Sequence, residues 1–320
     1  MAGRRRRDTK PEKSADDDVA SASTEIKAVP LRHPGRWVAA VVILILVGLF
    51  VYGAATNSNY HWDTYRAYLF DQRISTAAWN TLQLTFWAML LGGVLGVLLA
   101  VMRLSPNTVL KSVSWGYLWI FRGTPVYVQL VFWGLFTSLY PHLAFGIPFV
   151  HQFVHLDIQQ VNAGFFFAVI GLGLNESAYM AEIVRAGITS VDPGQGEAAS
   201  ALGMTWGHQM RRIVLPQAMR VIIPPTGNEL ISMLKTTSLV TAVPYTLDLY
   251  ETQRGISGVL FRPVPLLLVA STWYLAITSV LMIGQFFLER HYARGSSRKL
   301  TGRQQRAMQD LLRPDQGAMS

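Results

Sequence analysis

The sequence contains no cysteine, so disulfides, thiolate catalysis and cysteine metal sites are excluded. Charge is also scarce, because 15% of the 320 residues are charged and a soluble protein carries about 25%. There is no Gly-x-x-x-x-Gly-Lys-Ser/Thr phosphate loop, so we expect no ATP hydrolysis by this chain. What is abundant is hydrophobic residues, 51% of the chain, gathered in long runs. These runs indicate that a lipid bilayer surrounds much of the protein.

The apolar runs predict an all-α polytopic membrane protein with about six transmembrane helices, since a spanning helix needs about 20 mostly apolar residues. No secretory cleavage site follows the first run, which we therefore interpret as a retained span. The predicted spans are 37–53, 76–102, 123–140, 162–186, 218–240 and 266–288.

The formal charge of +9 does not indicate a nucleic-acid partner, because the basic residues flank the apolar runs. With both termini in the cytoplasm, 23 of the 28 Lys and Arg lie on the cytoplasmic side. The positive-inside rule thus predicts a multi-pass membrane protein with both ends in the cytoplasm. We expect a disordered tail at 1–36, a first span and outer loop at 37–74, a core at 75–290 and a basic tail at 291–320. A five-span chain without the first segment would keep the loop at 193–216 inside.

That loop is a polar segment between two long apolar runs, which is typical of a place where another protein docks. We expect Gly194 and Gly196 to form a turn and Glu197 to begin a short helix, where its carboxylate faces the positive end of the helix dipole. Gly203 either stops this helix with a left-handed residue or gives clearance to a partner. The alternative is an ordinary amphipathic surface helix. The candidate docking residues are Glu197, Ala198, Ala199, Gly203, Met204, Trp206, Ile213, Leu215 and Pro216.

Five polar residues within the fourth and fifth predicted spans are the candidate substrate pathway: Asn175, Glu176, Tyr179, Asn228 and Glu229. An ionisable group at that depth costs a few kcal/mol, so we expect it to face the bundle interior, a cavity or a partner. A purely structural hydrogen-bond network remains the alternative.

Other polar and small residues have local explanations. Glu182 and Arg185 are expected to pair along one helix, and Gly92 and Gly96 to let two helices pack closely. We predict no metal site, because the outer-loop histidines form no clear ligand set; they are His142, His151 and His155.

Glu-Ala-Ala at 197–199, Gly203 and Ile-x-Leu-Pro at 213–216 together resemble the cytoplasmic loop of bacterial ATP-binding-cassette importer permeases. Three more stretches are similar to the polar amino acid branch of these permeases, which carries histidine, glutamine, arginine or glutamate. They are Phe-Arg-Gly-Thr-Pro at 121–125, the segment 176–187, and Pro-Thr-Gly-Asn-Glu at 225–229 with Lys-Thr-Thr-Ser at 235–238. The resemblance covers about 75–290 and implies a five-helix core, to which the first span is an addition.

The resemblance implies a transport subunit of the bacterial cytoplasmic (inner) membrane and not an enzyme, with no cofactor of its own. The implied partners are an ATPase that binds ATP and Mg, a second permease chain of the same or a similar kind, an extracytoplasmic amino-acid-binding protein and a polar amino acid. Other substrates, such as an opine or a sulfur amino acid, stay open. So do an ion-coupled secondary transporter and a membrane sensor without transport. We expect Gly203→Asp to insert into the membrane but to lose ATPase association and transport.

Overall fold

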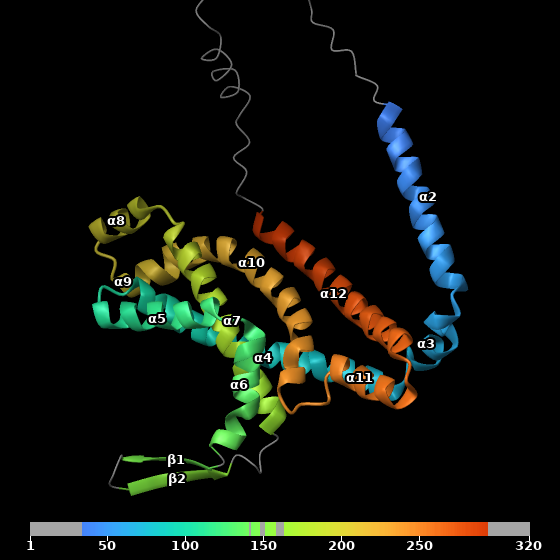
Figure 1. Cartoon of the computed structure of the whole chain (residues 1–320). Coiled ribbons are helices and arrows are strands. Elements are labelled where there is room, and N and C mark those ends of the chain that lie inside the picture. Colours follow the sequence, from blue (N-terminus) through green and yellow to red (C-terminus); the bar gives the residue numbers. More distant parts are fainter. Residues whose placement is uncertain (1–33, 141, 148–150, 158–162, 294–320) are drawn as a thin grey trace, which may run out of the picture. The chain divides into compact units, whose positions relative to one another are not determined.

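The computed structural model describes residues 34–140, 142–147, 151–157 and 163–293 (Figure 1). The predicted tails at 1–36 and 291–320 lie almost wholly outside these residues. The described chain divides into two compact units, and the division falls after Asn57.

The first unit contains the helix α2, Pro34–Thr56. It is long and apolar enough to cross a membrane, and nearly all its side chains are exposed. This is the pattern of a helix surrounded by lipid. The helix lies where the first span was predicted.

The second unit is helical, as predicted, apart from one short hairpin. Its helices are η1 (Ser58–Tyr60), α3 (Trp62–Tyr68), α4 (Gln72–Leu104), α5 (Thr108–Gly123), α6 (Val126–Leu139), α7 (Ala163–Thr189), α8 (Pro193–Ala201), α9 (Trp206–Gln209), η3 (Met210–Val214), α10 (Leu215–Thr236), η4 (Thr237–Ala242), α11 (Leu249–Leu260) and α12 (Pro263–Ala293). Across the described residues, four helices are long and apolar enough to span a membrane, namely α2, α4, α7 and α12.

The predicted span at 123–140 is divided in the structure. Its helix, α6, has 14 residues and is about 21 Å long, shorter than the roughly 30 Å hydrocarbon core. The 16-residue helix α5 precedes it, and Thr124 and Pro125 separate the two. The predicted span thus begins at the end of α5 and continues as the shorter helix α6.

The helices α4 and α7 pack closely along each other. A Cβ atom on Gly92 would lie 2.8 Å from Glu176 Cβ, and one on Gly96 would lie 2.5 Å from Met180 Cβ. Only glycine fits at either position. The close packing predicted for this pair of glycines is confirmed, and its partner is α7.

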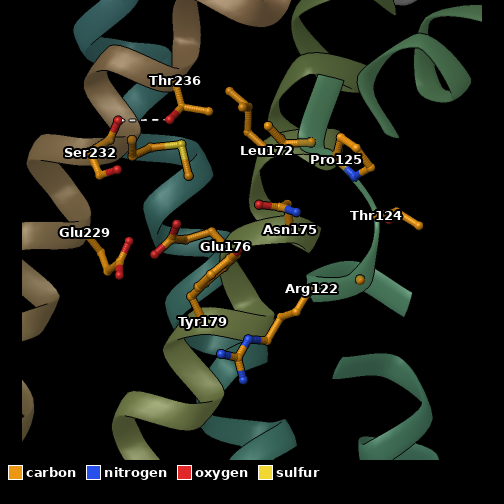
Figure 2. Close-up of a pocket in the computed structure, with 13 residues that line it drawn as sticks. Arg122, Thr124, Pro125, Leu172, Asn175, Glu176, Tyr179, Glu229, Ser232 and Thr236 are labelled. Atoms are coloured by element: carbon orange, nitrogen blue, oxygen red, sulfur yellow. Dashed lines mark hydrogen bonds between the residues drawn. The ribbon is translucent and has the colours of Figure 1, made fainter. Parts of the chain in front are cut away.

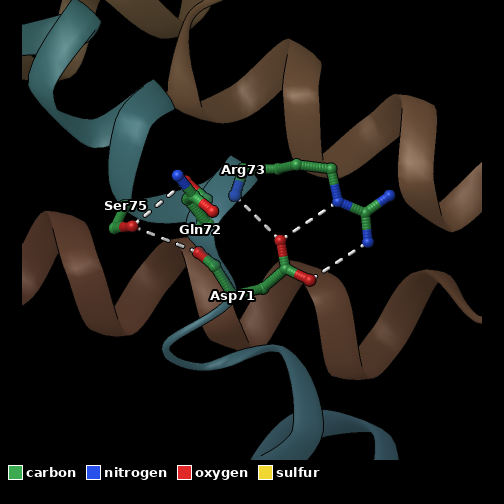
Figure 3. A network of polar contacts seen from close by, with 4 residues as sticks. All are labelled: Asp71, Gln72, Arg73 and Ser75. Atoms are coloured by element: carbon green, nitrogen blue, oxygen red, sulfur yellow. Dashed lines mark hydrogen bonds and ion pairs between the residues drawn. The ribbon is translucent and has the colours of Figure 1, made fainter.

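A network at Asp71 starts α4 (Figure 3). Asp71 Oδ1 accepts hydrogen bonds from Arg73 N at 2.8 Å and from Arg73 Nε at 3.0 Å. The carboxylate therefore caps the helix and pairs with the guanidinium at once. The Arg73 side-chain hydrogen bond lowers the pKa of Asp71.

The helix α3 packs on α12 through side chains that bridge more than 190 residues of sequence. Trp273 Nε1 donates to Leu69 O at 2.8 Å, and Arg262 donates to Thr64 Oγ1 at 2.5 Å. Part of the segment that the sequence grouped with the first span therefore belongs to the helical core.

The hairpin between α6 and α7 was not predicted. Strand β1 (His142–Ile147) pairs antiparallel with β2 (His151–Asp157), with His142 opposite Asp157. The register shifts between Phe145 and Gly146, as in a β-bulge.

Candidate functional site

A cavity of about 620 Å³ lies inside the helical core, between the α5–α6 junction, α7 and α10 (Figure 2). Its wall combines charged, hydroxyl and apolar side chains. The lining residues are Arg122, Gly123, Thr124, Pro125, Val126, Leu172, Asn175, Glu176, Tyr179, Glu229, Ser232, Met233 and Thr236.

The first wall is the break between α5 and α6. Pro125 has no N–H, so the carbonyl of Phe121 loses the donor that a continuous helix would supply. Two amides replace it: Gln129 Nε2 and Asn175 Nδ2 each donate to Phe121 O at 3.0 Å. Asn175 Nδ2 also donates to Gln129 Oε1 at 3.1 Å, which joins α7 to α6. Side-chain amides from α6 and α7 thus hold the break together.

The second wall is α7, which presents Glu176. Its side chain is almost completely buried, and among the described residues its Oε1 atom has no hydrogen-bond partner. Figure 2 shows Glu229 of α10 across the cavity, with its carboxylate directed toward Glu176. Two carboxylates that face one space create a negative potential in a low-dielectric setting, which favours a cation between them.

Arg122 and Tyr179 form one end of the same cavity. The guanidinium carbon of Arg122 lies 5.5 Å from the centre of the Tyr179 ring, in cation–π geometry. Arg122 was not predicted as a pathway residue. Its place in the last turn of α5, directly before the Gly-Thr-Pro break, was the available signal.

Of the five pathway candidates, Asn175, Glu176, Tyr179 and Glu229 line this one cavity. Asn228 does not, and its side chain is exposed on α10. Ser232 and Thr236 were missed, although they follow Glu229 at i+3 and i+7 on one helix face.

The expected local pairing of Glu182 and Arg185 is confirmed at 2.7 Å. Both side chains are partly exposed, so solvent screening keeps the contribution of this pair to stability small.

In the docking loop, residues 193–216, the first helix begins earlier than predicted. Asp192 Oδ1 accepts a hydrogen bond from Gly194 N at 2.8 Å, and Pro193 occupies the first helical position of α8. This cap and the fixed φ of proline outweigh the flexibility of Gly194 and Gly196. The turn expected there is wrong, and Glu197 lies in the middle of α8.

Gly203 ends α8 in the left-handed conformation, with φ of 75°. Met204 N donates to Ala199 O at 3.0 Å and Gly203 N to Ser200 O at 2.9 Å, which is a Schellman motif. No atom of the described chain lies within 4 Å of a Cβ placed on Gly203. The left-handed stop, one of the two roles expected for this glycine, is therefore confirmed.

The exposed surface of this loop differs from the predicted one. Trp206 and Leu202 expose 70% and 82% of their surface, and Ala198 is exposed too. Ala199 is 2% exposed, since α8 packs on α9 and η3, so it faces its own chain. Leu202 was missed, although an apolar residue in a polar loop was a usable signal.

The end of the loop runs directly into α10. Residues Met210–Val214 form a π-helix, which the sequence did not predict, and Leu215 and Pro216 open α10. Pro216 cannot donate to the carbonyl of Arg212, and an irregular turn accommodates that loss. Ile213 and Val214 are half-buried in this turn.

Residues 92–294 match the family described as the binding-protein-dependent transport system inner membrane component. This match covers more than half of the chain, so the chain belongs to that family. The predicted helical permease fold, its character as a transport subunit rather than an enzyme, and its multi-pass place in the inner membrane are thereby confirmed.

The arginine transport system permease protein ArgU of Corynebacterium glutamicum is similar, with 60% identity over 89% of this chain and 89% of that protein. The histidine/lysine/arginine/ornithine transport system permease protein HisM of Escherichia coli is 36% identical over 63% of this chain and 81% of that protein. The part of this chain outside the alignment with ArgU is shorter than the first unit, Met1–Asn57. The alignment therefore extends into α2.

Two solved structures share the fold. A crystal structure of an amino acid ABC transporter with histidines has a TM-score of 0.58 and 33% identity, covering 68% of this chain and 94% of the other. An inward-facing methionine ABC transporter has a TM-score of 0.52 and 18% identity, covering 68% and 95%. The second likeness supports the fold alone.

Proposed function

We propose that this chain is the permease subunit of an ATP-driven importer of polar amino acids and that its substrate carries a cationic side chain, with arginine the first candidate. The cavity carries this proposal, because it holds two carboxylates, Glu176 and Glu229, and one guanidinium, Arg122. Free arginine has two cationic groups and one carboxylate. The charges are complementary, whereas glutamate would meet like charges.

The functions for which these relatives are named support this substrate class. ArgU is described as an arginine permease, and HisM as a permease for histidine, lysine, arginine and ornithine. The names of these two relatives do not favour a sulfur amino acid or an ion-coupled mechanism.

Each cavity residue has a distinct task in this proposal. Glu176 supplies a buried acceptor oxygen with no competing partner in the described chain, so a cationic group of the substrate completes its hydrogen bonding. Glu229 faces the second cationic group from α10. Arg122 receives the substrate carboxylate at the opposite end, next to Tyr179. Asn175 holds the adjoining wall in place.

A second permease chain completes the pathway. Asn228 and Lys235 are exposed on α10, and a charged or amide group facing lipid is costly. We therefore place the second chain, of the same or a similar kind, against this face of α10. Asn228 contributes to that interface rather than to the cavity.

The ATPase docks on the exposed face of α8 and α9. Leu202 and Trp206 fill a groove on it, Gly203 fixes the turn between them, and Glu197 and Ala198 lie alongside. ATP and Mg are bound by that separate chain, and this chain carries no cofactor. The positive-inside pattern then places both termini and this loop in the cytoplasm, with the binding protein on the opposite side.

The test is uptake of a labelled panel of arginine, lysine, histidine, glutamine, glutamate, methionine and an opine in cells with and without this gene. Redundant uptake systems are removed first. We expect the deletion to abolish uptake of the cationic amino acids alone. In the complemented cells, Glu176→Gln should lower arginine uptake about tenfold or more, as for a lost charged hydrogen bond. Glu251→Gln, on α11 and outside this cavity, is the matched control. Unchanged arginine uptake in the deletion would contradict the proposal.

A further inference from the structure

The helix α10 links the docking loop to the cavity, and two prolines break its backbone hydrogen-bond ladder on the way. Pro224 and Pro225 lie inside it and have no N–H group. The carbonyls of Arg220 and Val221, one turn earlier, therefore have no backbone donor. Before the break, α10 continues directly from the π-helix of the docking loop. After the break, Glu229, Ser232 and Thr236 line the cavity. A prolyl break of this kind is a natural point of bending.

One side chain from α12 reaches this break. Gln285 Nε2 donates to Pro224 O at 2.8 Å, and it also donates to Glu289 Oε1 at 2.8 Å. The other side of the same amide lies against Gly227, because a Cβ atom there would overlap Gln285 Oε1. Glycine at 227 is therefore what lets the amide sit across the break.

The segment before the break has open space beside it. A second cavity, of about 520 Å³, is lined by residues from α10, α12 and the turn after α7 that include Gln217, Arg220, Pro224 and Glu289. On its other side, Ala218 and Ile222 pack tightly against α7. The first turns of α10 thus have a fixed contact on one side and room on the other.

We propose that Gln285 is a positioning residue that holds α10 at its proline break, so that a displacement of the docking loop becomes a displacement of Glu229, Ser232 and Thr236. Without this hydrogen bond the two halves of α10 bend independently, and ATP hydrolysis no longer moves the cavity wall. The substrate assigned to the cavity rests on the proposed function. The mechanical link does not depend on which substrate it is.

The absence of cysteine from the chain provides a direct test, since a single introduced thiol is the only one to label in this subunit. Ser232→Cys places it on the cavity wall beyond the break. The permease–ATPase complex is assembled in proteoliposomes, and the rate of labelling by a charged thiol reagent is measured with and without ATP. In the otherwise native chain we expect ATP to change that rate by about tenfold, the size of a typical coupling between sites.

Gln285→Met keeps the volume of the side chain and removes the donor, and Gly227→Ala displaces the amide. We expect each to abolish the ATP-dependent change in labelling at residue 232, while the complex still assembles and hydrolyses ATP. Transport per ATP should fall about tenfold for the same reason. Gly284→Ala is the matched control on α12, because its added methyl meets open space, and it should retain the native response.

Any of three results overturns the proposal. The first is that ATP does not change the labelling rate at residue 232 in the otherwise native chain. The others are a native labelling response, or a native number of substrates per ATP, in Gln285→Met. If Gln285 had a purely structural role, its replacement would lower the yield of complex. The ATP-dependent change in labelling and the number of substrates transported per ATP would then stay at their native values. If ATP changes the labelling but arginine is not transported, the substrate assignment fails and the role of Gln285 stands.

Discussion

The docking loop exposes apolar side chains, and the cavity buries an ionisable one. Both are the reverse of the usual placement in a folded protein. Leu202 and Trp206 are apolar and exposed, whereas Glu176 is ionisable and buried. An exposed apolar pair indicates a protein surface that covers it, and a buried unpaired carboxylate oxygen indicates a cation that completes it. In the proposed function, this partner is an ATPase at the first region and the substrate at the second. Each anomaly thus describes the chemistry of what binds there.

The largest effect is expected at Gly203. Gly203→Asp puts a charge and a side chain on the left-handed residue of the Schellman motif, so ATPase retention and uptake should fall at least about a hundredfold. Co-purification of the ATPase with the membrane-inserted chain measures this. Gly203→Asn is the matched variant, because asparagine tolerates the same backbone without the charge. If both variants bind the ATPase normally, the docking loop is misassigned.

Truncation of the exposed apolar pair separates docking from folding. We expect Trp206→Ala and Leu202→Ala each to weaken ATPase binding about thirtyfold, as for interface hot spots worth about 2 kcal/mol. The melting temperature of the isolated chain should stay unchanged, since neither side chain is buried in it. Titration of the ATPase onto detergent-solubilised chain gives the affinity. Leu247→Ala, exposed elsewhere, is the control.

The opposite result is expected for the buried carboxylate. Glu176→Gln should lower transport about tenfold or more and yet raise the melting temperature of the substrate-free chain by about 2–4 °C, because it replaces a buried ionisable group with a neutral one of similar size. Thermal unfolding in detergent, followed by tryptophan fluorescence, measures the change. A lower melting temperature would mean that Glu176 stabilises the helical core and is not held there for a ligand.

A buried carboxylate with a structural task sharpens this contrast. Asp248 caps α11, with Oδ2 accepting from Tyr250 N at 2.9 Å, and burial raises its pKa from 3.8 to about 6. Because the folded-state pKa lies above the unfolded value, stability should rise as the pH falls from 7 to 4, by about 2 kcal/mol.

Asp248→Asn keeps an acceptor for the cap and should remove that pH dependence while uptake is retained. Unfolding midpoints at several pH values between 4 and 7 measure it. The same pH dependence in the asparagine variant would assign the titration to another group.

Features set by local chemistry were predictable from the sequence. The apolar runs, the close packing at Gly92 and Gly96, the left-handed Gly203 and the Glu182–Arg185 pair depend on spacing along one helix or on one residue type. Four of the five pathway candidates also meet in one cavity, because depth in the membrane and helix periodicity place them together.

Features set by tertiary contacts were not predictable. The Asp192 cap outweighed two glycines, and Ala199 turned inward because α9 and η3 cover it. Arg122 lies in the cavity wall because α5 ends at the α5–α6 break, where the amides of Gln129 and Asn175 bond to the carbonyl of Phe121. The sequence shows Pro125, but it does not show which side-chain amides donate to the carbonyl that this proline leaves without a backbone donor.

The central claim is that the cavity recognises positive charge. Arginine and citrulline have the same shape and differ in side-chain charge, so their binding to the purified permease–ATPase complex, without the binding protein, tests the claim most directly. We predict that arginine binds at least about tenfold more tightly and that Glu176→Gln removes this preference. Equal affinities for the two ligands in the native complex would contradict the account.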